Sequence, residues 1–160
     1  MNEALLSDSI DMARRALASH DTGSVIEFSF AAMFYASVMA LEKAVPPIMV
    51  TDVMRADKME LIKAVRREFV DTGRMDSQDL GSFEDCVKLR KRVFDSDRRT
   101  VDDSSVERWQ DIPAHLVIKA LNKITGVSVT AAKAMVESAE RYVYAIGLAT
   151  QSIRQHERQR

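Results

Sequence analysis

Apolar residues recur at three- and four-residue steps along most of the chain, and this spacing is typical of amphipathic helices. The pattern first runs over residues 2–19 and is broken by the polar stretch His20–Ser24. We therefore expect a first helix over residues 2–19, followed by a turn. The apolar face of this helix is formed by Leu6, Ile10, Ala13 and Leu17.

The next segment, residues 25–44, is apolar on nearly every face and is followed by a Pro-Pro pair that ends it. A helix of this kind must be covered all round. Its most apolar part, residues 25–41, is at the short limit of about 17 residues for a membrane span and includes Glu27. We therefore expect the central helix of a bundle, with Phe34 in the core, and no membrane association.

Three more helices are predicted further along the chain. Residues 61–70 place their apolar side chains on one stripe. A helix that begins near position 76 or 82 contains the stretch Arg90–Asp97, and a long closing helix runs from about residue 128 to residue 157. The charged end of the chain, residues 154–160, is expected to fray.

Connectors separate these helices. Residues 45–60 are rich in Val, Met and charge, and the polar residues 98–112 have almost no apolar periodicity. A short helix is expected over residues 112–126, because Pro113 would lie in its first turn. The chain is therefore predicted to be one all-α domain over residues 1–160, an up-and-down four-helix bundle with one or two additional short helices.

Composition narrows the possible functions. Lys and Arg number 23 against 24 Asp and Glu, so there is no global basic field of the kind that drives non-specific nucleic-acid binding. Cys86 is the only cysteine, which excludes an intrachain disulfide and a cysteine-rich zinc site. The acidic N-terminal residues are unlike a signal peptide. We expect a cytoplasmic protein with no metal and no other cofactor.

Four stretches resemble the HEPN domain family of small helical-bundle proteins. FSFAAMFYASVMAL, residues 28–41, resembles the second helix of that family. FVDTGRMD and the later LRKRVFDSD, residues 89–97, resemble its next pair of helices, and AAKAMVESAERYVYAI, residues 131–146, resembles its closing helix. The resemblance covers most of the chain and implies a HEPN-like bundle that forms homodimers.

The resemblance also implies a possible chemistry. Nucleases of this family cleave RNA without a metal, with an arginine that holds the phosphate and a histidine, separated from it by four to six intervening residues, that transfers a proton. If Arg90 stands at the arginine position, the histidine window falls on Asp95, Ser96 and Asp97. A carboxylate is a weak base and is almost never protonated at neutral pH, so it replaces the imidazole poorly. We expect the nuclease chemistry to be absent.

Two other arginine–histidine pairs satisfy the loose spacing. Arg14 and Arg15 precede His20, which lies in the predicted turn after the first helix. Arg108 precedes His115, with a proline between them that disturbs the helical register. The alternative catalytic set is therefore Arg90, Arg108 and His115.

A basic group remains as the best candidate for binding RNA phosphate or an acidic partner. Its alternative interpretation is solvated charge paired with local acids such as Glu84. The main hypothesis is a HEPN-like, non-catalytic binding protein, a homodimer with a protein or RNA partner, as in toxin–antitoxin or defence-type systems. The alternatives are a ribonuclease with a displaced site and an accessory subunit of a nucleotidyltransferase-type partner. The basic group consists of Lys88, Arg90, Lys91, Arg92, Arg98 and Arg99.

Overall fold

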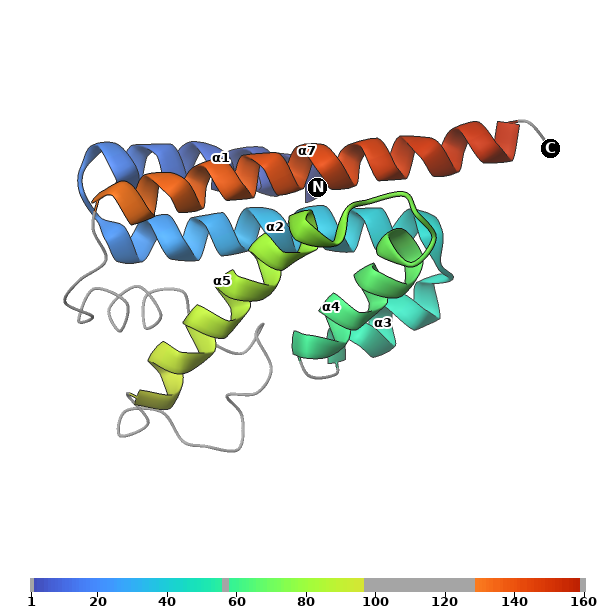
Figure 1. Cartoon of the computed structure of the whole chain (residues 1–160), viewed down its shortest axis with the longest axis horizontal. Helices are drawn as coiled ribbons and strands as arrows, with labels where there is room; N and C mark the ends of the chain where they lie inside the picture. Colours follow the sequence, from blue (N-terminus) through green and yellow to red (C-terminus); the bar gives the residue numbers. More distant parts are fainter. Residues whose placement is uncertain (1, 56–57, 97–128, 159–160) are drawn as a thin grey trace.

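The computed structural model describes residues 2–55, 58–96 and 129–158, and of these residues 2, 58, 91–96, 129 and 154–158 are described by their backbone alone (Figure 1). This part of the chain forms helices and turns and contains no strand, so the predicted all-α class is confirmed. The elements are α1 (Asn2–Ala18), α2 (Thr22–Ala44), α3 (Pro47–Arg55), α4 (Lys58–Val65), the π-helical turn η1 (Arg66–Val70), α5 (Ser77–Ser96) and α7 (Val129–Arg158).

Three long helices, α1, α2 and α7, lie side by side along the long axis of the molecule (Figure 1). α2 and α7 run in the same direction and α1 runs in the opposite one. α5 packs against α2 and α7 but crosses them obliquely, while α3 and α4 lie against the C-terminal part of α2. The C-terminal end of α7 projects beyond its neighbours, as its predicted length implies.

A left-handed turn at His20 separates α1 from α2. His20 has a φ of 59°, its N–H donates to the carbonyl of Leu17 (3.2 Å), and the N–H of Asp21 donates to the carbonyl of Ala16 (2.9 Å). This pair of hydrogen bonds is the Schellman ending of a helix. The Asp21 carboxylate then accepts hydrogen bonds from the backbone N–H and the hydroxyl of Ser24, which caps the start of α2.

The core lies where α2, α5 and α7 meet. The ring of Phe83 lies 6.1 Å from that of Phe30 and 5.3 Å from that of Tyr142, measured between centroids. The hydroxyl of Ser37 donates to the carbonyl of Met33 (2.7 Å) and lies 2.5 Å from the Tyr142 hydroxyl. Because the single Ser37 proton goes to Met33, Tyr142 donates to Ser37, and both buried hydroxyls are satisfied.

The predicted place of Phe34 in the core needs correction. Phe34 is only partly buried at the edge of the core, where it stacks on Phe30 with centroids 6.1 Å apart. Phe30 and Met33 hold the buried positions instead. Since α2 is apolar on nearly every side, its sequence does not reveal which of its aromatic rings points inward.

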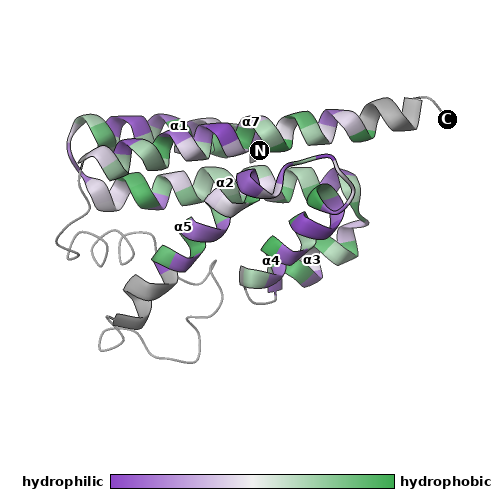
Figure 2. Cartoon of the chain, viewed as in Figure 1, coloured by the Kyte–Doolittle hydropathy of each residue, from purple (hydrophilic) through white to green (hydrophobic). Residues whose placement is uncertain are grey.

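Of the helices that the structure describes, α2 alone is long and apolar enough to cross a membrane. Within its most apolar window, 72% of the residues are buried inside the protein. Figure 2 shows hydrophilic stretches in purple on α1 and α4, whereas α2 is mainly pale or green. α1, α5 and α7 pack around α2. α2 is therefore covered by other helices, as expected for the central helix of a bundle.

The connector predicted over residues 45–60 is wrong, because α3 and the start of α4 lie there. Pro47 occupies the first position of α3, where its missing N–H has no helical partner to lose. Val50 packs into the core, while Ile48 and Met49 stay exposed. A nine-residue helix with a single buried residue leaves too little periodicity to be recognised.

The boundaries of the other helices agree with the sequence pattern to within a few residues, and α5 starts at Ser77. The predicted polar connector 98–112 and the short helix 112–126 lie outside the described residues. α7 continues to Arg158, and fraying of residues 154–160 stays a prediction.

Candidate functional site

A buried ion pair joins α2 to α5. Glu27 lies near the start of α2 in an otherwise apolar stretch, and Arg90 lies on α5. Arg90 donates from Nε to Oε2 of Glu27 (2.8 Å) and from Nη2 to Oε1 (3.0 Å). The side chains of Arg90 and Glu27 are only 5% and 8% exposed. This is a bidentate arginine–carboxylate pair shielded from water.

Apolar groups complete the surroundings of this pair. The guanidinium carbon of Arg90 lies 4.2 Å from the centroid of the Phe30 ring, which is the geometry of a cation–π contact. Burial raises the pKa of the Glu27 carboxyl above its usual value, while the charge and the hydrogen bonds of Arg90 oppose that rise. The guanidinium is therefore engaged by Glu27 along one edge and by Phe30 on one face.

This geometry restricts what Arg90 can do chemically. A phosphate that approached the Nε edge would compete with Glu27 for the two donors, Nε and Nη2, that already hold the carboxylate. Removing the arginine from its carboxylate would leave a buried, unpaired charge, which is strongly unfavourable. The structure places Arg90 in the interior and not on an exposed basic edge of α5, where the sequence pattern suggested it.

Cys86 lies one helical turn before Arg90 and is fully buried. We expect this thiol to resist labelling in the folded protein, because burial and the nearby Glu27 carboxylate raise its pKa to about 12. A disulfide reagent at pH 8 should react at least roughly a hundredfold more slowly in buffer than in denaturant. Cys86→Ala supplies the blank, since the chain has no other cysteine. Rapid labelling of the native protein would show that this region opens readily.

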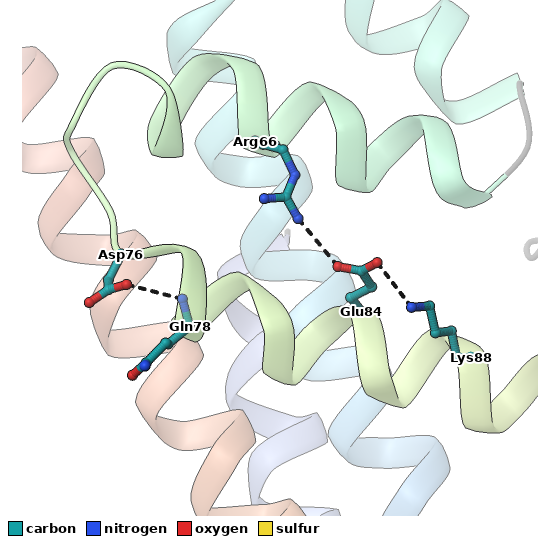
Figure 3. Close-up of polar contacts among 5 residues, drawn as sticks. All are labelled: Arg66, Asp76, Gln78, Glu84 and Lys88. Atoms are coloured by element: carbon teal, nitrogen blue, oxygen red, sulfur yellow. Dashed lines mark hydrogen bonds and ion pairs between the residues drawn. The ribbon is translucent and has the colours of Figure 1, made fainter.

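A second arrangement lies on the surface between η1 and α5 (Figure 3). Glu84 forms ion pairs with two cations: Nη2 of Arg66 lies 3.3 Å from Oε2, and Nζ of Lys88 lies 3.2 Å from Oε1. Asp76 accepts a hydrogen bond from the backbone N–H of Gln78 (3.1 Å) at the start of α5. One carboxylate therefore partly neutralises two of the cations on this surface.

The structure brings few of the predicted site residues together. Lys88 and Arg90 lie on α5, but one is exposed and bound to Glu84 while the other is buried. Lys91 and Arg92 continue α5, with no description of their side chains. The residues that lie outside the described part of the chain are Arg98, Arg99, Arg108 and His115.

The earlier arginine–histidine pair is not brought together as a site. Arg14 donates from Nε to Oε1 of Glu140 (2.9 Å), which ties α1 to α7. His20 lies in the left-handed turn after α1. Within residues 2–55, 58–96 and 129–158, moreover, no three His, Cys, Asp or Glu side chains are placed to share a metal ion.

Glu27 is the residue that the sequence pattern did not identify as a partner of Arg90. The sequence feature that pointed to a partner was a single carboxylate, Glu27, in a segment that is otherwise buried on nearly every side. A charge in that position must be paired, because an isolated buried carboxylate is very costly. The sequence therefore indicates that Glu27 has a positively charged partner. It does not indicate which residue that partner is, because this depends on how α5 crosses α2.

No protein-family model, curated protein sequence or solved structure matches this chain.

Proposed function

We propose that this chain is a HEPN-like helical bundle that acts as a non-catalytic interaction protein, forms a homodimer and has a protein as its partner. The single observation that carries this proposal is the buried pairing of Arg90 with Glu27. The arginine that would hold an RNA phosphate in a nuclease of this kind acts here as a structural link between α2 and α5. Catalysis would need a free arginine beside a proton-transfer group.

The surface charges favour a protein partner over RNA. Cations on α4, η1 and α5 have acidic neighbours, which weakens any field that would attract a polyanion. Large apolar side chains are exposed on α3 and α7, where a protein could cover them. The ion pairs are Lys63 with Glu60, Arg66 and Lys88 with Glu84, and Arg67 with Glu68. On these two helices the exposed large apolar residues are Ile48 and Met49 of α3, and Tyr144 and Leu148 of α7.

The test is to incubate the purified protein with labelled single-stranded RNA in the presence of a chelator, while fluorescence anisotropy reports binding. We expect the RNA to stay intact and to bind weakly at low salt, with the affinity falling steeply as salt is raised. Lys88→Glu should weaken this residual binding, because it removes an exposed positive charge. The matched control is Lys43→Glu, a charge reversal at an exposed position at the far end of α2.

One outcome would replace the proposal by its main alternative. Metal-independent cleavage that disappears in His115→Ala would show that a histidine outside the described residues supplies the proton transfer. The protein would then be a ribonuclease with a displaced site, for which the sequence offers Arg90, Arg108 and His115.

A further inference from the structure

α7 carries a continuous exposed row on the side that faces away from the core. Seven residues recur at alternating steps of four and three, which is the spacing of the contact positions in a helix pair. The opposite side of α7 is packed into the core through residues such as Val136, Tyr142 and Ile146. The exposed row consists of Thr130, Ala134, Glu137, Arg141, Tyr144, Leu148 and Gln151.

Two large side chains of this row are exposed to an unusual degree. Tyr144 is 70% exposed and Leu148 is 48% exposed, although side chains of this kind are normally covered in part. Both line an open groove of about 640 Å³ along α7, together with Glu137 and Arg141. Asp79, at the start of α5, also lines this groove.

The order of residues in the row makes it self-complementary. If a second copy of α7 lies antiparallel, with the two-fold axis level with position 139, Glu137 faces Arg141 of the second copy. The same symmetry places Tyr144 opposite the small Ala134 of the second copy, and Leu148 opposite Thr130 of the second copy. Each large residue therefore meets a small one and each charge meets its opposite, and the two-fold axis repeats every contact.

We propose that this α7 row is the seam of the homodimer, with a second copy of the chain as its occupant and the two α7 helices antiparallel. The inference rests on the homodimer of the proposed function and adds the surface and the register. The seam from Thr130 to Leu148 is about 27 Å long at 1.5 Å per residue. A single helix pair of this length lies at the small end of stable interfaces, so the dimer should dissociate on dilution.

Charge reversal tests the register directly. In Glu137→Arg, each arginine at position 137 meets Arg141 of the second copy, and in Arg141→Glu the carboxylates meet in the same way. Each variant alone should show an apparent dissociation constant weaker by about tenfold or more, because like charges then face each other twice. Mixing the two variants should restore dimers, since both pairs are then of opposite charge. The double variant Glu137→Arg/Arg141→Glu should likewise dimerise.

Sedimentation equilibrium over a range of concentrations measures these masses, and helical circular dichroism confirms that each variant is folded. Glu3→Arg, an exposed reversal on α1, is the matched control and should dimerise as the native protein does. A native protein that stays at the monomer mass of 18.0 kDa at high concentration would overturn the homodimer itself. If both single variants dimerise with native affinity, the homodimer stands but its interface is not the α7 row. Neither result bears on RNA cleavage, which is measured separately.

Discussion

Replacing Arg90 by Ala is expected to destabilise the fold by about 3–5 kcal/mol, because it leaves the Glu27 carboxylate buried without its partner. Glu27→Ala should cost a similar amount for the converse reason, since the guanidinium over Phe30 would lose its carboxylate. Small domains have only about 5–15 kcal/mol of total stability, so either change is severe. Urea denaturation monitored by circular dichroism measures the free energy of unfolding of each variant.

Replacing both members of the pair should have a very different result. In Glu27→Leu/Arg90→Met the two buried charges disappear together, and the thioether of the methionine can pack against Phe30. Hydrophobic replacements of buried ion pairs are often neutral or stabilise by about 1–4 kcal/mol. We expect the double variant to be at least as stable as the native protein. If each single variant lost less than about 1 kcal/mol, the pair would not be buried in solution as described.

The pH dependence of this comparison has a definite sign. The folded-state pKa of Glu27 is raised by burial, so its contribution to stability is present below the unfolded-state pKa and is lost as the pH rises through the folded-state pKa. The double variant lacks this carboxyl. Its stability relative to the native protein should therefore be greater at pH 7 than at pH 4. The opposite trend would show that the charge and hydrogen bonds of Arg90 outweigh burial and lower the folded-state pKa of Glu27.

Phe83→Ala is the second large effect that we expect, with a loss of about 3–5 kcal/mol in the free energy of unfolding. Phe83 is fully buried, and its ring lies between those of Phe30 and Tyr142. Truncation leaves a cavity that its neighbours on α2 and α7 cannot fill without moving those helices.

Phe34→Ala is the matched control for Phe83→Ala. The same atoms are removed, but Phe34 is partly exposed, so the loss should be roughly half as large. Denaturant melts of the two variants decide the order. A larger loss for Phe34→Ala would mean that the ring of Phe34 is covered in solution, for example by a second copy of the chain.

The helices were largely predictable from the sequence, because hydrophobic periodicity over 17 or more residues is a strong local signal. The apolar character of α2 also identified it as a covered helix. α3 was missed because it is short and buries a single residue, and the place of Phe34 was misassigned because α2 has apolar residues on every side. What the pattern does not contain is the orientation of each helix relative to the others.

The candidate site illustrates the same limit. The family resemblance suggested Arg90 for the arginine of the nuclease motif, and no histidine stands in the window that follows it. Its partner, Glu27, is 63 residues away and meets it only because α5 crosses α2 near the start of α2. Electrostatic pairing between distant helices depends on tertiary packing, and no local pattern reports it. The prediction of a basic edge on α5 likewise assumed that each cation points outward. Arg90 points inward.

The central claim is that Arg90 holds the fold together and does not bind a substrate, and RNA binding by Glu27→Leu/Arg90→Met tests it most directly. This variant removes the arginine while the fold is expected to survive, which circular dichroism verifies first. Fluorescence anisotropy with labelled single-stranded RNA at low salt should give the same weak affinity as the native protein, with the RNA uncut in both. A folded double variant that has lost RNA binding, or lost a cleavage activity that the native protein possesses, would contradict the account.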